Sequence, residues 1–294
     1  MAMTTKKQAI CRPQHALIRD PEAGRLLWLS DGVTELKVSL DYGPRILHLS
    51  CVDMENLFYA QPADLSDGLA TPEGWRLRGG HRLWAAPEGD LSYYPDNEPV
   101  AWELLEDGVR LTQPVDPWLQ IRKRIELHYE PDGAILVLQS IENAGTQPAS
   151  LASWGVNTFA GGGYAEAEFE GSEPGSFRPG RFLSLWGQTS LADPRITLKQ
   201  NRVCAQHLPR QEYFKIGLYS HSGRATLWNR RQRLELSFGA DAFGRYPDGG
   251  CNFELFLNPN IMELEALGPL CTLAPGEQAC HWERWRVSPC GDAK

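Results

Sequence analysis

The sequence predicts an all-β fold in which large antiparallel sheets form a sandwich. Its 294 residues include 28 glycines and 21 prolines, spread along the chain, which leave little room for long helices. Between them, short segments alternate apolar and polar side chains, the pattern of a half-buried strand. Turn sequences such as Asp31-Gly32 and Asn143-Ala144-Gly145 separate these segments. No amphipathic helix pattern lies between the strand segments, which argues against a βαβ fold.

The strand pattern recurs from the first third of the chain to its end. A tight Pro275-Gly276 turn precedes the last strand segment. In contrast, the Gly- and Glu-rich segment Phe159–Arg181 predicts a long excursion from the sheets. No linker divides the chain, so we expect one domain over residues 1–294 with an ordered core over about residues 8–288. The predicted strands are Leu36–Leu40, Ile46–Val52, Val109–Thr112, Gln120–Tyr129, Ala134–Glu142, Phe214–Tyr219, Ala225–Asn229, Leu234–Phe238, Cys251–Leu257 and His281–Val287.

The charge and hydropathy of the chain restrict its partners. It carries 29 Lys and Arg against 37 Asp and Glu, a formal net charge of −8. Nucleic-acid binding depends on clustered cations, so we expect no nucleic-acid partner. No apolar stretch approaches the roughly 20 residues of a membrane-spanning helix. No apolar segment follows Lys6 and Lys7, as a secretory signal would require, so we expect a cytoplasmic protein without membrane contact.

Metal and nucleotide motifs are missing from the sequence. The seven cysteines form no CxxC pair, and the seven histidines have neither HxxxH nor HExxH spacing. The run Gly161-Gly162-Gly163 lacks the strand-to-helix context and the lysine of a phosphate-binding loop. We therefore expect no metal ion and no cofactor.

The segment Arg76–Glu88 concentrates side chains that suit a sugar ligand. If it forms a strand, Arg82 and Trp84 share one face and His81 lies on the other. A guanidinium donates hydrogen bonds to hydroxyls, and an indole covers the apolar face of a sugar ring. The alternative is a surface loop in which Arg and Glu pair with each other and Trp belongs to the core.

Two glutamates in the C-terminal part of the chain predict acid/base chemistry. Glu263 and Glu265 are two residues apart, so on a strand both point to one face, while Met262 and Leu264 point to the other. Neighbouring carboxylates repel each other, and burial would raise the pKa of one of them, as suits a general base or acid. The alternatives are that both face solvent on an edge strand, or that one pairs with an arginine.

Five segments along the chain carry a family resemblance: Gly79–Glu88, Phe214–Gly217, Tyr246–Asn252, Glu263–Pro269 and Leu273–Glu277. Together they resemble a branch of the galactose-mutarotase-like (aldose 1-epimerase-like) superfamily. The resemblance extends from about Gly32 to Val287, essentially the whole chain. It implies a β-supersandwich in which a concave face binds carbohydrate.

The resemblance also implies catalytic roles. In aldose epimerases, a Glu in a Leu-Glu-Thr stretch is the general base on the anomeric hydroxyl, and a His protonates the ring oxygen. Leu264-Glu265-Ala266 matches that stretch, which implies Glu265 as the base, with Glu263 as the second candidate. Trp154 stands where the epimerases place their acid histidine. Because an indole does not donate a proton at ordinary pH, His81 becomes the candidate acid.

The same resemblance indicates residues that contact the substrate. Lys215 lies near the position of the family's sugar-holding aspartate, where it suits an acidic sugar or a hydroxyl, or pairs with Glu263 or Glu265. The other candidates would orient polar substituents or stack on the sugar ring: Arg45, Arg82, Trp84 and Trp154.

Two functions follow from these observations. The first is an aldose 1-epimerase-like isomerase that acts on a small-molecule sugar by acid/base catalysis, as a monomer or homodimer. The alternative is a non-catalytic carbohydrate-binding protein that uses the same concave cleft. A role beside polysaccharide-degrading machinery is disfavoured because the chain shows neither a partner domain nor an export signal.

Overall fold

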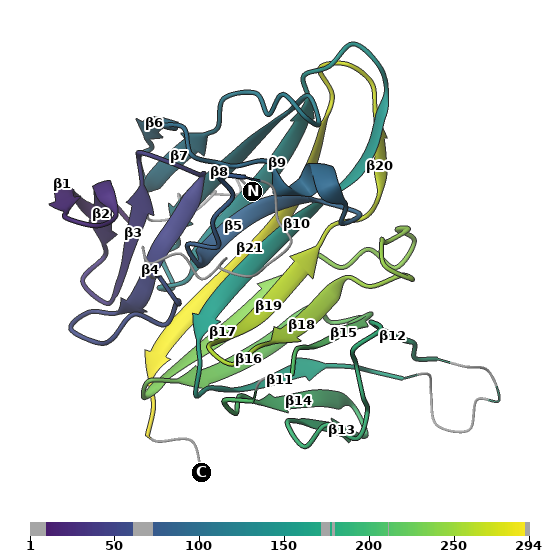
Figure 1. Ribbon diagram of the computed structural model, residues 1–294. Coiled ribbons are helices and arrows are strands. Elements are labelled where there is room, and N and C mark those ends of the chain that lie inside the picture. Colours follow the sequence, from purple (N-terminus) through teal and green to yellow (C-terminus); the bar gives the residue numbers. More distant parts are fainter. Residues whose placement is uncertain (1–9, 61–72, 172–176, 178–179, 211, 292–294) are drawn as a thin grey trace, which may run out of the picture.

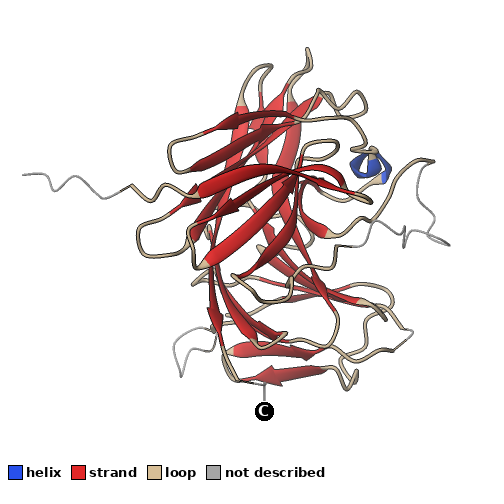
Figure 2. Ribbon diagram, turned by 90° about the vertical axis from the view of Figure 1, so that its left-hand side faces the viewer, coloured by secondary structure: helices blue, strands red, loops and turns tan. Residues whose placement is uncertain are grey.

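Antiparallel strands carry nearly all of the regular structure in the computed structural model, which describes residues 10–60, 73–171, 177, 180–210 and 212–291. Within these residues the only helix is the short 3₁₀ helix η1 (Asp90–Tyr93), as Figures 1 and 2 show. The described part of the chain contains no helix that is long and apolar enough to cross a lipid bilayer. The all-β prediction is confirmed, with two large sheets.

The larger sheet has eleven strands, and its central strands form the floor of the candidate site. The strand β20 (Cys271–Leu273) pairs with β10 outside the main path. In spatial order, the path runs β1 (Gln14–Asp20), β2 (Gly24–Ser30), β3 (Thr34–Ser39), β4 (Arg45–Cys51), β5 (Gly80–Ala86), β10 (Ala149–Ala160), β19 (Ile261–Leu267), β18 (Phe253–Leu257), β15 (Phe214–Leu218) and β12 (Leu183–Leu185).

The second sheet has ten strands and packs against the first. Its strands also pair antiparallel along the whole path. The order is β13 (Ile196–Lys199), β14 (Arg202–Gln206), β11 (Tyr164–Glu168), β16 (Arg224–Asn229), β17 (Gln232–Phe238), β21 (Gln278–Pro289), β9 (Ile135–Asn143), β8 (Ile121–Tyr129), β7 (Gly108–Thr112) and β6 (Ala101–Leu104).

The core lies between the two sheets, as the alternating sequence pattern requires. In β8 and β17, every second side chain is buried. Phe238 of β17 stacks on Phe253 of β18 with ring centroids 5.2 Å apart, a contact that joins the sheets. Trp285 of β21 contacts Phe58 edge-on at 5.7 Å. Apolar burial on the inner faces leaves the outer face of the larger sheet free to carry polar side chains.

The ten predicted strands are all present, with ends shifted by a few residues at most. The turn at Pro275-Gly276 is also present. The expected excursion over Phe159–Arg181 is wrong for Tyr164–Glu168, which form β11 because Ala165 and Ala167 pack into the core. The strand β21 continues to residue 289, one residue past the expected core. Residues 8, 9, 172–176 and 178–179 lie outside the described residues.

Removal of a buried ring between the sheets tests this account of the core. Phe159 of β10 is fully buried and stacks on Phe58 with centroids 5.2 Å apart. We expect Phe159→Ala to lower the free energy of unfolding by about 3–5 kcal/mol, measured by urea denaturation. The matched control is Phe243→Ala, because Phe243 is 97% exposed; it should change stability by no more than about 0.5 kcal/mol. Similar losses for the two variants would contradict the assignment of the core.

Candidate functional site

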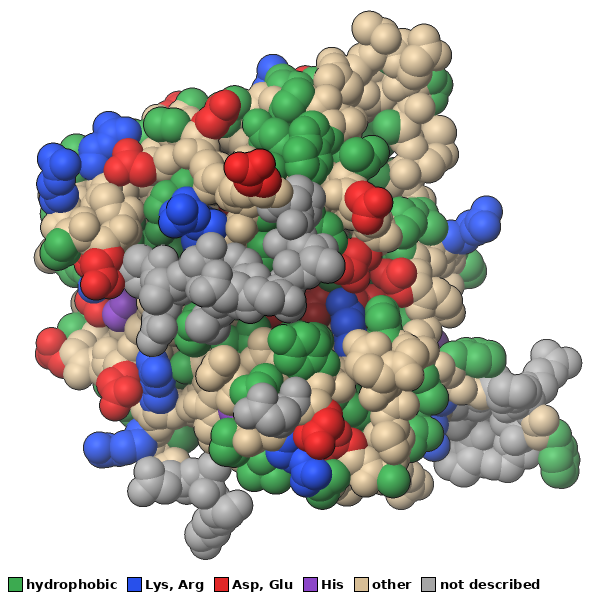
Figure 3. Space-filling view, in the orientation of Figure 1, with side chains coloured by type: hydrophobic (Ala, Val, Ile, Leu, Met, Phe, Trp, Pro, Cys, Tyr) green, Lys and Arg blue, Asp and Glu red, His purple; other side chains and the backbone are tan. Residues whose placement is uncertain are grey.

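A cavity of about 340 Å³ opens on the outer face of the larger sheet, above β5, β10, β19 and β15. Figure 3 shows acidic and basic side chains together in a hollow of the face that Figure 1 presents. The lining combines two kinds of side chain. Aromatic walls come from Trp75, Trp84, Tyr93, Trp154, Trp186, Tyr213 and Phe256, and charges come from Arg82, Glu88, Lys215, Glu263 and Glu265.

Strand register explains why these charges meet. Glu265 of β19 lies directly opposite Glu254 of β18 on one side and Val156 of β10 on the other. On β15, Gly217 lies opposite Glu254, and Lys215 lies two residues further along, opposite Phe256. Its long side chain therefore reaches diagonally to both glutamates. The arrangement therefore depends on pairing between strands that are far apart in the sequence.

Glu265 is the most constrained acidic group of the cavity. Its side chain is almost fully buried, at 1% exposure. Its Oε2 accepts hydrogen bonds from Trp154 Nε1 at 2.8 Å and from Lys215 Nζ at 3.0 Å, whereas its Oε1 has no partner among the described residues. Burial raises the pKa of Glu265. The nearby charge of Glu263 raises it further, whereas Lys215 lowers it. A carboxyl with a raised pKa is suited to exchange a proton with a ligand, because its pKa lies nearer to neutral pH than that of an ordinary glutamate.

Lys215 lies between two carboxylates and two indoles. Its Nζ is 2.8 Å from Glu254 Oε2 and 3.0 Å from Glu265 Oε2. The same atom lies 4.7 Å from the ring centre of Trp154 and 5.1 Å from that of Trp186. Burial opposes the charged form, but Glu265 and Glu254 outweigh it and raise the pKa of Lys215. Of the partners that the sequence suggested for Lys215, the structure shows Glu265. The positive charge of Lys215 is therefore already neutralised by carboxylates of the protein.

Glu254 is a member of the cluster that the sequence reasoning missed. It is fully buried, and burial raises its pKa well above the usual range, with Lys215 opposing and Glu265 adding to the shift. A signal was present, because Glu254 is the charged residue in the otherwise apolar strand Phe253–Leu257. Trp186 and Tyr93, which also line the cavity, lie in segments without a comparable pattern.

Glu263, like Glu265, is held through one of its two oxygens. Its Oε1 accepts a hydrogen bond from Thr158 Oγ1 at 2.6 Å and lies 3.5 Å from a guanidinium nitrogen of Arg82. That guanidinium also lies over the Trp84 ring, 4.2 Å from its centre. The alternative in which one glutamate pairs with an arginine thus holds for Glu263. Both glutamates keep a second oxygen without a hydrogen-bond partner among the described residues, and that of Glu265 is the buried one.

His81 does not reach the cavity. On β5, Arg82 and Trp84 line the cavity as predicted, whereas His81 lies on the opposite face, between the two sheets, where it is fully buried. Its Nδ1 lies 2.9 Å from Asn157 Oδ1, and its ring contacts Trp285 edge-on at 5.1 Å. Burial lowers the pKa of His81. The geometry therefore does not support the expectation that His81 acts as the acid on a ligand.

Arg45 is likewise separated from the cavity. Its guanidinium pairs with Asp96 at 2.9 Å and donates hydrogen bonds to the backbone oxygens of Leu77 and Gly79 at 2.9 Å. It supports the chain segment that leads into β5 and does not line the cavity. Six of the eight predicted site residues do line it: Arg82, Trp84, Trp154, Lys215, Glu263 and Glu265.

The indoles of the cavity pack against each other as well as toward the open space. Trp84 and Trp154 meet edge-to-face with ring centroids 5.2 Å apart, and Tyr93 contacts Trp84 at 5.1 Å. Trp154 has a role beyond the predicted stacking, since it donates its N–H to Glu265. The hydroxyl of Tyr93 donates a hydrogen bond to Glu88 at the exposed rim. No group of three potential metal ligands is found among the residues that the structure describes.

Comparisons with known proteins support the fold. No protein-family model matches the sequence, and no curated protein is detectably similar to it. A candidate aldose 1-epimerase from Klebsiella pneumoniae superimposes with a TM-score of 0.62 at 10% identity, covering 94% of this chain and 83% of the other. A candidate aldose 1-epimerase from Escherichia coli gives 0.57 at 16% identity, covering 88% and 97%. A galactose mutarotase-like protein from Lactobacillus casei gives 0.57 at 12% identity, covering 94% and 100%.

These likenesses show the fold alone, because every identity is low. The galactose-mutarotase-like sandwich that the sequence resemblance implied is therefore confirmed.

Removal of the Lys215 ammonium group should destabilise the protein in a pH-dependent way. In Lys215→Met, Glu254 and Glu265 face each other without a counter-charge, so we expect a loss of about 3–5 kcal/mol at pH 8. Their raised pKa values mean that the folded protein keeps protons that the unfolded chain releases. Stability then falls as pH rises above the ordinary value of 4.5, and the loss should be smaller at pH 5.

Urea denaturation of the wild type and of Lys215→Met at pH 5 and pH 8 measures how the loss of stability depends on pH. The double variant Lys215→Met/Glu254→Gln, which removes one of the facing charges, should recover part of the stability at pH 8. Equal losses at the two pH values would show that the carboxylates do not respond to Lys215.

Proposed function

We propose that the cavity binds a sugar ring and that the protein is an aldose 1-epimerase-like isomerase, with Glu265 as the general base. The observation that carries the proposal is the free Oε1 of a buried carboxyl with a raised pKa, set among aromatic walls. Indole and phenol rings suit the apolar faces of a sugar, and the charged groups suit its hydroxyls. The fold shared with proteins described as aldose 1-epimerases adds an argument by analogy.

In this mechanism, Glu265 Oε1 accepts the proton of the anomeric hydroxyl. Trp154 and Lys215 hold Oε2 and thereby fix the carboxylate for the transfer. The bond between the anomeric carbon and the ring oxygen breaks, and its electron pair goes to the ring oxygen, which takes up a proton. Rotation of the open-chain aldehyde and reversal of these steps give the other anomer. Because His81 lies between the sheets, the candidate donor is Tyr93 of the cavity lining, although its hydroxyl already donates to Glu88.

A second candidate function is sugar binding without catalysis in the same cavity. One observation favours it: burial raises the pKa of Tyr93, and Glu88 adds to the rise, so this hydroxyl holds its proton tightly. A donor of this kind is poorly matched to a ring oxygen near neutral pH.

The cytoplasmic location and the monomer or homodimer state stay predictions from the sequence.

The charges of the cavity favour a neutral sugar. Lys215 is paired with two carboxylates and Arg82 with Glu263, so the cations of the described lining are already balanced. A phosphate or carboxylate on the ligand would meet Glu88 and Glu265 without a free counter-charge. This argues against the acidic sugar that Lys215 alone suggested.

Polarimetry on freshly dissolved pure anomers tests the isomerase. The protein should accelerate the change in optical rotation for at least one sugar in a panel of hexoses and pentoses. Glu265→Gln should lower this rate by roughly 10²- to 10⁴-fold, because the base is lost. Glu263→Gln, the matched control on the same strand, should retain most of the rate. The wild-type rate should rise with pH as Glu265 ionises, through a pKa above that of a free glutamate.

Binding measurements separate the two functions. Sugars that bind by calorimetry but mutarotate at the rate of the buffer would establish the non-catalytic function. Full activity of Glu265→Gln would instead overturn the base assignment and move it to Glu263.

A charge series tests the ligand class independently of catalysis. We expect galactose or glucose to bind more tightly than its 6-phosphate or its uronic acid, measured by calorimetry at equal ionic strength. Preferential binding of the anionic sugars would mean that Lys215 or Arg82 leaves its carboxylate partner to meet the ligand.

A further inference from the structure

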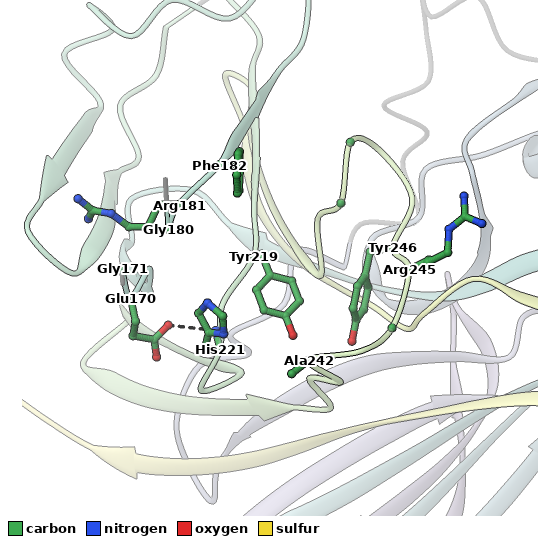
Figure 4. Close-up of a pocket in the computed structure, with 13 residues that line it drawn as sticks. Glu170, Gly171, Gly180, Arg181, Phe182, Tyr219, His221, Ala242, Arg245 and Tyr246 are labelled. Carbon is green, nitrogen blue, oxygen red and sulfur yellow. Dashed lines mark hydrogen bonds between the residues drawn. The ribbon is translucent and has the colours of Figure 1, made fainter. Parts of the chain in front are cut away.

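A second hollow lies beside the β15 end of the cavity. It has a volume of about 830 Å³ and is lined in part by Phe182, Tyr219, His221 and Tyr246. Figure 4 shows the rings of Tyr219 and Tyr246 side by side, with both hydroxyls directed the same way, and His221 next to Tyr219. The ring centroids of the two tyrosines are 5.5 Å apart, and those of Tyr219 and His221 are 4.9 Å apart. We call this surface the aromatic hollow.

The aromatic hollow lies along the same strand as the cavity. Lys215 and Gly217 share the outer face of β15, and Tyr219 directly follows the last residue of this strand, Leu218. Lys215 lines the cavity and Tyr219 lines the aromatic hollow. Four residues of extended chain span about 13 Å, so the two sites are neighbours.

Gly217 lies midway between Lys215 and Tyr219 in the chain. A Cβ at this position would lie 2.4 Å from Cys251 Sγ and 3.3 Å from the Trp186 ring, so glycine makes room for both side chains. Ser184 of β12 donates a hydrogen bond to the backbone oxygen of Asp248 at 2.6 Å and fixes this edge of the sheet. Because Trp186 lines the cavity and also lies against Gly217, one ring borders the cavity on the side of the aromatic hollow.

A fixed carboxylate adds polar character to the aromatic hollow. Glu170 accepts hydrogen bonds from the backbone N–H groups of His221 and Ser222, each at 3.1 Å. Burial opposes ionisation, but the Ser222 side chain and these backbone groups outweigh it and lower the pKa of Glu170. The aromatic hollow thus joins ring faces with an ionised hydrogen-bond acceptor, which is the combination that sugar hydroxyls and ring faces require.

We propose that the aromatic hollow binds a second sugar unit of a ligand that places its first unit in the cavity. The proposal rests on the proposed function of the cavity and extends it from single sugars to neutral oligosaccharides. The short separation of Lys215 and Tyr219 along the chain, the position of Trp186 against Gly217 and the ring faces of the aromatic hollow carry the argument.

Calorimetry with sugars of increasing length tests this proposal. The probes are galactose with its β-1,4-linked di- and tetrasaccharide, and glucose with maltose, maltotetraose, cellobiose and cellotetraose. We expect the oligosaccharides of one series to bind more tightly than their monosaccharide, by about three- to tenfold for the added aromatic contact. Tyr219→Ala should abolish this gain and leave the monosaccharide affinity unchanged.

Two further variants make the result specific. Phe182 is 67% exposed, so Phe182→Ala should fold normally and should also reduce the gain from the second unit. Tyr94→Ala, the control, removes a partly exposed tyrosine that packs on Trp118 and does not line the aromatic hollow; it should leave the length dependence intact.

The outcomes separate this proposal from the proposed function. The second-unit proposal is wrong if monosaccharides bind but added units bring no gain in affinity. It is also wrong if Tyr219→Ala weakens monosaccharide and oligosaccharide binding equally. In both cases the cavity remains a sugar site. An absence of binding for every probe would overturn the cavity as a sugar site, and the aromatic hollow with it.

Discussion

The buried contact of Lys215 with Glu254 and Glu265 is the constraint from which the site is built. Two carboxylates lie directly opposite each other on β18 and β19, an arrangement that is unfavourable without a cation or a proton between them. Lys215 supplies the cation from the next strand, at 2.8 and 3.0 Å. The pairing therefore links three strands through side chains on the outer face, while the apolar inner faces of the same strands form the core.

The contact also sets what each carboxylate can do. Glu254 does not line the cavity, and its one ion pair among the described residues is with Lys215. Glu265, which lines the cavity, binds Lys215 and Trp154 through one oxygen, while its other oxygen is buried and has no hydrogen-bond partner among the described residues. Glu263, two residues earlier, is occupied by Thr158 and by the guanidinium of β5. The three glutamates thus differ in which side chains bind them.

Sequence alone predicted which side chains share a face, but not which strands are neighbours. Period-two alternation correctly placed Arg82 apart from His81, and it placed Glu263 with Glu265. The partners of these residues come from strands distant in the sequence, which alternation does not specify, so Glu254 was missed. The first strand, Gln14–Asp20, was missed for another reason: it is exposed along nearly its whole length and has no alternating pattern.

Trp154 connects the chemistry of the site to its ligand. Where the epimerase resemblance would place an acid histidine, the indole gives its N–H to Glu265 and cannot also give a proton to a ligand. In the proposed mechanism, Trp154 therefore helps to hold the base Glu265 and does not serve as the acid. With its cations already paired, the cavity offers a ligand chiefly a carboxylate oxygen and ring faces. Under the proposed function, a neutral polyhydroxylated ring suits this site better than an anion, because it brings its own hydrogen-bond donors and an apolar face.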